Sequence, residues 1–172
     1  MKIAVLFSFG TEEIEALTPV DVLRRAGATV DIVSVSGEYP KGSHDIIVKA
    51  DKVVEDTDFS EYDAIVIPGG MPGAKIISEN GMAMEGIINA IKSNKLVAAI
   101  CASPAVVLGE HGLIGKNKAT CYPADVFIEV LGENFTGKDV EVSDNLITAN
   151  GPKSAMSFAL EICKKLNLTP KF

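Results

Sequence analysis

The chain has 172 residues, of which 47% are hydrophobic, so it is long enough to build one domain around a substantial core. We therefore expect a single domain over residues 1–172. The 16 basic and 23 acidic side chains give a net charge of -7, which disfavours nonspecific binding to nucleic acid or to an anionic membrane surface.

Apolar runs and helical segments alternate along the chain. The predicted strands, in chain order, cover residues 3–7, 30–35, 64–67, 96–100 and 146–149. Each is an almost unbroken apolar run, which is typical of strands that are buried on both faces. The predicted helices between and after them cover residues 12–26, 82–93, 103–110, 124–131 and 154–166. This alternation predicts an α/β fold, a three-layer sandwich with a mainly parallel sheet between helices.

Two features interrupt this rhythm. Pro19 lies inside the first predicted helix, which we expect either to kink there or to restart with Thr18 as its cap. Residues 37–54 and 137–149 are rich in turn residues and short β-prone pieces. We expect both segments to form β-hairpin additions at the edges of the sheet.

The cysteines indicate reduced thiols. Cys101, Cys121 and Cys163 are odd in number and widely spaced, and the chain has only two histidines. Neither a disulfide framework nor a metal site is therefore expected. The apolar run after Met1 is too short for a signal peptide or a membrane span. We expect a cytoplasmic protein that does not associate with membranes.

Cys101 follows the fourth predicted strand, at the point where a helix of small residues begins. On such a turn the free N–H groups of the new helix point at the side chain and favour thiolate over thiol. The small residues Ala99 and Ser103 meet the steric demand of a nucleophile elbow. The alternative that the sequence leaves open is a buried structural cysteine, because free cysteine is among the most buried residue types.

Other turns are expected at the same edge, since ligands of open α/β sheets bind outside the carboxyl ends of the strands. After the first strand, Glu12 and Glu13 suit a helix N-terminus, whereas Glu15 has apolar neighbours and is a candidate acid or base. The glycine-rich turn 68–73 is able to present N–H groups to an anion, but it lacks a nucleotide fingerprint. Residues 150–152 either mark the start of the last predicted helix or form part of the binding site at the same edge of the sheet.

Four motifs occur in order along the chain and together resemble the ThiJ/PfpI superfamily, in its DJ-one branch. They are EEIE at 12–15 with PVDVLRRAG at 19–27, YDAIVIPGG at 62–70, AAICASP at 98–104 and NGP at 150–152. The resemblance implies a flavodoxin-like α/β sandwich, usually a homodimer, with a reactive elbow cysteine beside a glutamate and no cofactor.

Carried onto this chain, the catalytic roles fall on Cys101 and Glu15, and the amides of Gly70 and Ala102 form the oxyanion pocket. The residues expected to line the pocket are Gly69, Ser103, Tyr122, Gly151 and Pro152. His44 stands where related dimers place an arginine that reaches toward the partner's site. The resemblance therefore implies a role across the interface, against the alternative of a plain surface histidine.

The chain also departs from the family. Many members have a histidine directly after the cysteine, whereas this chain has Ala102, so protease chemistry is not expected. Tyr122 replaces a second histidine, and tyrosine is a poor base at neutral pH. Lys153 replaces the usual glycine after Gly-Pro and adds positive charge near the rim.

Two functions remain open. In the first, the Cys101 thiolate adds to a small 2-oxoaldehyde or a glycation adduct, as in a glyoxalase or deglycase. In the second, an oxidant converts Cys101 to sulfenic and then sulfinic acid, and the protein is a redox sensor or stress chaperone. Both need a protonated Glu15 that donates to the sulfur, because an ionised carboxylate would raise the pKa of the thiol.

Overall fold

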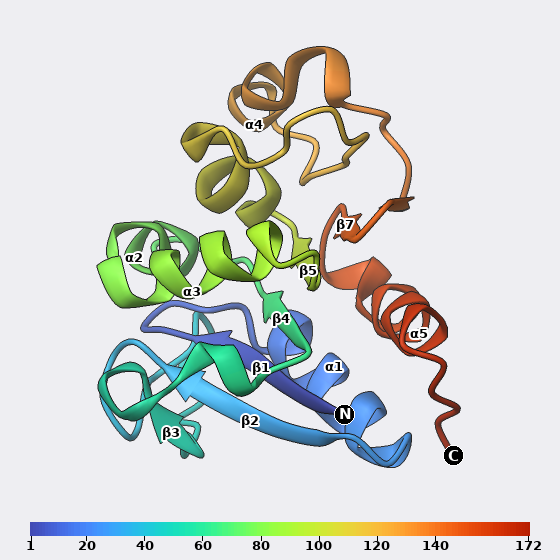
Figure 1. Cartoon of the computed structure of the whole chain (residues 1–172). Coiled ribbons are helices and arrows are strands. Elements are labelled where there is room, and N and C mark those ends of the chain that lie inside the picture. Colours follow the sequence, from blue (N-terminus) through green and yellow to red (C-terminus); the bar gives the residue numbers. More distant parts are fainter.

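A seven-stranded sheet in the order β3-β2-β1-β4-β5-β7-β6 forms the centre of the molecule (Figure 1). The computed structural model describes residues 1–172. The strands are β1 (Lys2–Phe7), β2 (Thr29–Ser34), β3 (Lys52–Val53), β4 (Ala64–Ile67), β5 (Leu96–Ile100), β6 (Val140–Ser143) and β7 (Leu146–Ala149). All pairs are parallel except the last, in which β6 runs antiparallel to β7.

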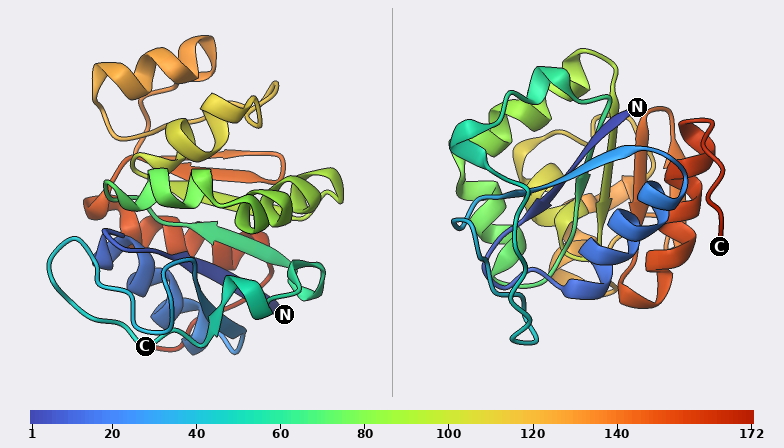
Figure 2. Two further views of the ribbon diagram at one scale, coloured as in Figure 1. Left: turned by 90° about the vertical axis from the view of Figure 1, so that its left-hand side faces the viewer. Right: turned by 90° about the horizontal axis from the view of Figure 1, so that it is seen from below.

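Helices cover both faces of this sheet. They are α1 (Glu13–Arg25), α2 (Gly73–Glu79), α3 (Gly81–Lys92), α4 (Asp125–Leu131) and α5 (Ala155–Lys165). Helices α1 and α5 lie side by side on one face, and α2 and α3 lie on the other (Figure 2). The predicted α/β sandwich with a mainly parallel sheet is confirmed. No helix is both long and apolar enough to cross a bilayer.

The central strands contribute to two separate cores. In β1, Ile3, Val5 and Phe7 face the core beneath α1 and α5. Ala4 and Leu6 face the opposite core, beneath α3. Because successive side chains of a strand point to opposite faces, a strand that is covered on both sides needs apolar residues at every position. This double burial explains the unbroken apolar runs in the sequence.

Helix α1 runs through Pro19 without a restart, so of the two predicted alternatives the restart at Thr18 is wrong. Glu12 is the N-cap, and its carboxylate oxygen Oε2 accepts the backbone N–H of Glu15 at 2.9 Å. A capping carboxylate satisfies one of the free N–H groups at the helix start.

Of the two predicted hairpins, the second is regular and the first is irregular. Residues 137–149 contain the antiparallel pair β6–β7. Residues 38–50 also fold back on themselves: the N–H groups of Gly42, Val48 and Ala50 donate to the carbonyls of Ile46, Pro40 and Glu38, and Lys41 and Ile47 form one antiparallel bridge. This segment has no regular strand pair, and residues 52–53 form β3, which pairs with β2 in parallel.

The helix predicted over residues 103–110 has a different form. Residues Pro104–Leu108 make a π-helical stretch, and Gly109–His111 continue it as a 3₁₀ turn. The two adjacent valines and the glycine in this segment are poor α-helix formers. Helix α2, which the sequence did not predict, begins at Gly73, the last residue of the glycine-rich turn, so its start carries the signal of a turn.

Candidate active site

Three turns meet where the sheet changes direction. Strands β1 and β4 are neighbours, but the chain continues from β1 toward β2 on one side and from β4 toward β5 on the other. In open α/β sheets such a switch point is the usual ligand site. The N–H of Glu12, after β1, donates to the carbonyl of Gly69, after β4, at 3.0 Å. The turn after β5, with Cys101, lies against the same glycine.

Cys101 has the backbone conformation of an elbow. Its φ is +66°, a left-handed value that costs a non-glycine residue about 1–2 kcal/mol. Hydrogen bonds hold this strained residue on both sides: its N–H donates to the Ala149 carbonyl at 2.9 Å, and its carbonyl accepts the N–H of Tyr122 at 2.8 Å. Cys101 is partly exposed, whereas Cys121 and Cys163 are buried. Cys101 is thus the thiol that solvent reaches most easily.

Glu15 is fully buried beside Cys101. Its Oε2 accepts the N–H of Gly69 at 2.8 Å, while Oε1 is buried without a hydrogen-bond partner. Because the carbonyl oxygen of a carboxylic acid is the better acceptor, a neutral Glu15 carries its proton on Oε1. A Cβ on Gly69 would lie 2.6 Å from Oε2 of Glu15 and 2.6 Å from Cβ of Cys101, so only glycine fits between them.

Burial dominates the titration of this pair. It raises the pKa of Glu15 to about 7, although Cys101 and the Gly69 N–H act against it. Burial also raises the pKa of the Cys101 thiol, and negative charge on Glu15 raises it further. The elbow N–H groups lower the thiol pKa as expected, but burial outweighs them, so the elbow alone does not make Cys101 a thiolate. Thiolate forms at the sulfur only when Glu15 holds the remaining proton of the pair.

Two backbone amides oppose the rise in the thiol pKa. The N–H groups of Ala102 and Gly70 donate to the Cys101 sulfur and favour its charged form. Gly70 has a φ of +88°, and a Cβ at this position would collide with the carbonyl of Gly10. Both predicted oxyanion donors thus point at the atom that would carry out nucleophilic attack.

The other predicted lining residues are distributed unevenly. Tyr122 is 45% exposed, and its ring lies about 3.4 Å from where a Cβ of Gly151 would be. Pro152 is partly exposed at the start of the 3₁₀ turn Pro152–Ser154, and Lys153 is exposed within that turn. Ser103 does not line the pocket: it is fully buried, and its hydroxyl donates to the Pro68 carbonyl at 2.6 Å.

His44 forms a contact that the sequence did not reveal. Its Nδ1 lies 2.8 Å from Oε2 of Glu13, and its backbone N–H donates to Oε1 of Glu13 at 2.7 Å. Oε1 of Glu12 is 3.7 Å from the same Nδ1. These three side chains are close enough to share a cation. The direct bond between His44 and Glu13 already accounts for the arrangement, and a role of His44 across a dimer interface stays a prediction.

Each partner of this bond shifts the pKa of the other. The hydrogen bond and the negative charge of Glu13 raise the pKa of His44. Burial raises the pKa of Glu13, but the hydrogen bonds from His44 outweigh it and hold that pKa below the ordinary value. The sequence predicted only that Glu13 stabilises the helix N-terminus. The contact with His44 was missed because residues 31 positions apart give no local signal of contact.

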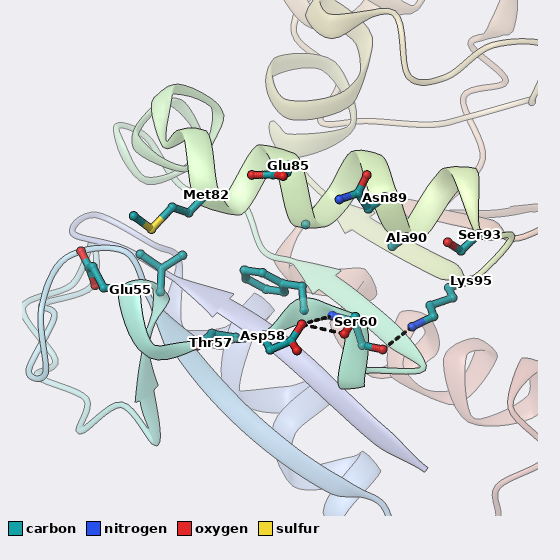
Figure 3. A pocket seen from close by; sticks show the side chains of 13 residues that line it. Glu55, Thr57, Asp58, Ser60, Met82, Glu85, Asn89, Ala90, Ser93 and Lys95 are labelled. Carbon is teal, nitrogen blue, oxygen red and sulfur yellow. Dashed lines mark hydrogen bonds between the residues drawn. The ribbon is translucent and has the colours of Figure 1, made fainter.

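A separate cavity of about 310 Å³ lies between α3 and residues 54–60 (Figure 3). Its side chains include Glu55, Asp58 and Glu85, and neither Cys101 nor Glu15 borders it. Asp58 is occupied by two hydrogen bonds from Ser60. This cavity is therefore not part of the candidate active site.

The fold and these contacts define an α/β protein with a thiol on a strand-to-helix elbow and a buried carboxyl beside it. Residues 1–165 match the DJ-1/PfpI family. The chain belongs to this family, and the resemblance seen in the sequence is confirmed.

Relatives agree with this assignment. Protein DJ-1 homolog B of Arabidopsis thaliana is 36% identical over 169 residues, which are 96% of this chain but only 38% of that protein. The chain thus spans well under half of this relative. A glutathione-independent glyoxalase of Caenorhabditis elegans is 34% identical, with 90% of this chain and 82% of the relative covered. The structure of oxidized DJ-1 from Toxoplasma gondii has a TM-score of 0.92 and 41% identity, over 96% of this chain and 90% of that one.

Proposed function

We propose that the chain is a slow, cofactor-independent enzyme that acts on small 2-oxoaldehydes and converts methylglyoxal to lactate. The observation that carries this proposal is that Cys101 lies beside the fully buried carboxyl of Glu15, whose Oε1 has no other hydrogen-bond partner. That oxygen is the only one of the carboxyl group that is free to exchange a proton. The relative in Caenorhabditis elegans is named a glyoxalase, which supports the same class of substrate.

The first step is addition of sulfur to the aldehyde. Ionised Glu15 takes the thiol proton on Oε1 while the Cys101 sulfur forms a bond to the aldehyde carbon. The electron pair of the carbonyl moves to its oxygen, which the N–H groups of Gly70 and Ala102 stabilise as an oxyanion. Protonation of this oxygen gives a hemithioacetal.

The second step is an internal redox exchange that needs no external oxidant. Glu15 removes the proton from the former aldehyde carbon and returns a proton to the neighbouring carbon, through an enediol. The product is a lactoyl thioester on Cys101. Water then cleaves the C–S bond, which releases lactate and restores the thiol. The same addition to early glycation adducts would give a deglycase activity.

A second function has its own observation. Cys101 is the one partly exposed thiol, whereas Cys121 and Cys163 are buried, and all three cysteines are free. An oxidant in solution therefore reaches Cys101 first and converts it to sulfenic and then sulfinic acid. The amides that hold an oxyanion are also suited to a sulfinate. The alternative is thus a redox sensor or stress chaperone, and the Toxoplasma gondii relative is described as oxidized.

Turnover of purified protein with methylglyoxal distinguishes the two functions. We expect lactate from the wild type, none from Cys101→Ser, and a wild-type rate from Cys163→Ala, which removes a buried thiol of α5. If the wild type forms no lactate but mild peroxide gives sulfinate only at Cys101, the sensor replaces the enzyme. If neither product forms, both proposals are wrong.

We also propose that the protein is a cytoplasmic homodimer. All three cysteines are free, as is typical of a reducing compartment. Four large apolar side chains near the start of α1 and on the loop beside it are about half exposed or more: Phe9, Ile14, Ile46 and Ile47. Sedimentation velocity is expected to show a dimer in wild type and a monomer in Ile14→Lys, whereas a monomeric wild type contradicts the proposal.

A further inference from the structure

Ser103 makes a bond that helix starts do not usually make. A serine at this position commonly accepts an N–H of the first helical turn. Here the π-helical stretch Pro104–Leu108 receives no such side-chain bond from Ser103. Its hydroxyl instead donates to the carbonyl of Pro68, which lies 35 positions away in the chain, at 2.6 Å and in a fully buried setting.

This bond connects the two turns that carry the oxyanion donors. The register between β4 and β5 ends at the pair Ile67–Ala99, and beyond it no strand pairing fixes the separation of the chains. The Ser103–Pro68 bond lies just past that point. Gly70 follows Pro68 by two residues, and Ala102 immediately precedes Ser103. The bond therefore continues the alignment of β4 and β5 into the site.

We propose that Ser103 is a positioning residue, whose hydroxyl holds the Gly70 and Ala102 amides at a fixed separation around the Cys101 sulfur. The proposal deepens the proposed function, because the same amides stabilise the substrate oxyanion there. Loss of the hydroxyl leaves the Pro68 carbonyl without this donor and removes a side-chain bond between the two turns that does not involve the sulfur itself. Misaligned amides stabilise negative charge on sulfur or oxygen less well.

The test is the rate at which iodoacetamide alkylates Cys101 as a function of pH, in the folded protein. Ser103→Ala is expected to lower the alkylation rate at neutral pH about tenfold and to move the midpoint of the pH profile upward. The loss in rate is smaller than that from deleting an oxyanion donor, because both amides remain. In turnover, kcat falls and KM stays near its original value. The matched control is Thr120→Val, which removes another fully buried hydroxyl that donates to a carbonyl at 2.6 Å, that of Lys138.

The outcomes separate positioning from stability and from the proposed function. Thermal unfolding measures the stability loss of both variants, and only Ser103→Ala is expected to change alkylation. Ser103→Gly must reproduce the change, which excludes an effect of the alanine methyl group. An unchanged profile in folded Ser103→Ala, or an equal change in Thr120→Val, overturns the positioning role. If wild type lacks turnover while Ser103→Ala still slows alkylation, the proposed function fails and the positioning role remains.

Discussion

The Glu15 carboxyl accepts the backbone N–H of Gly69 through Oε2, at 2.8 Å, across 54 positions of sequence. This one bond decides the chemistry of the other oxygen. With Oε2 committed as the acceptor, Oε1 is left to carry the proton. The backbone of the turn after β4 thus orients the acid and base group of α1 beside the cysteine that follows β5.

The reactivity of Cys101 is expected to rise as the pH passes through about 7. Below this value the pair holds two protons, because burial raises the pKa of Glu15 to about 7, and no base is present. Above it the pair has lost one proton, and Glu15 is able to accept the second from the thiol. The check is the pH profile of lactate formation, for which a flat rate between about pH 5 and 8 contradicts this role.

Glu15→Gln is expected to separate thiol reactivity from turnover. Glutamine keeps an oxygen for the Gly69 N–H and offers an N–H to the sulfur, so alkylation of Cys101 at neutral pH persists. It cannot exchange a proton, so turnover falls by about 100-fold or more. Glu15→Leu, which offers the sulfur no donor, is expected to lose both. An unchanged Cys101 pKa in the leucine variant refutes the hydrogen bond from Glu15.

Glu15 also makes stability depend on pH. A buried carboxyl whose pKa is raised on folding stabilises the protein below its unfolded pKa, and this contribution is lost as the pH rises through the folded value. For a shift from 4.5 to about 7 the loss is roughly 3 kcal/mol. Urea unfolding measures the free energy of unfolding of wild type and Glu15→Gln at the two pH values. The difference between them is expected to favour the variant more at pH 8 than at pH 4. A constant difference at both pH values rules this out.

Gly69→Ala is expected to destabilise the protein by about 1–3 kcal/mol and to slow alkylation of Cys101. The new methyl group would displace both Cys101 and Glu15, which lie too close to admit it. The control is Gly81→Ala, at the exposed start of α3, where a Cβ has nothing within 4 Å. Alanine is the better helix former, so this variant is expected to be neutral or slightly stabilised. Equal losses in the two variants contradict the steric argument.

The bond between His44 and Glu13 is expected to be visible by NMR titration. The pKa of His44 is raised above its ordinary value by Glu13, and Glu13→Gln is expected to return it toward that value. Since a raised histidine pKa stabilises the fold below the unfolded value, this contribution is lost as the pH rises through the folded one. His111, the only other histidine, is the internal reference. A His44 titration that is the same in both proteins shows that the bond does not form in solution.

The sequence predicted the sheet and the residues at its edge because both leave local signals. Unbroken apolar runs identified the central strands, and the turns after them placed Cys101 and Glu15 on one rim. The sequence did not reveal that residues 37–54 end in β3, because a strand of two residues leaves no periodic pattern.

The parts of the site that were missed depend on contacts between distant segments. Ser103 was expected in the pocket because it follows the elbow, yet its hydroxyl bonds to Pro68 on a neighbouring strand's turn. The sequence also predicted a lowered pKa for the Cys101 thiol, whereas burial raises it. The helix start that lowers this pKa is visible in the sequence, but the extent of burial that raises it is not.

The hydrogen bond from the Cys101 N–H to Ala149 has a consequence for the order of synthesis. Ala149 ends β7, which is synthesised well after the elbow, so the elbow lacks one of its two backbone anchors until then. A nascent chain that has reached residue 120, for example, contains Cys101, Glu15 and both amides, but β7 does not yet hold the strained turn. The thiol thus acquires its final geometry only after residue 149 has been added, 48 positions beyond Cys101 itself.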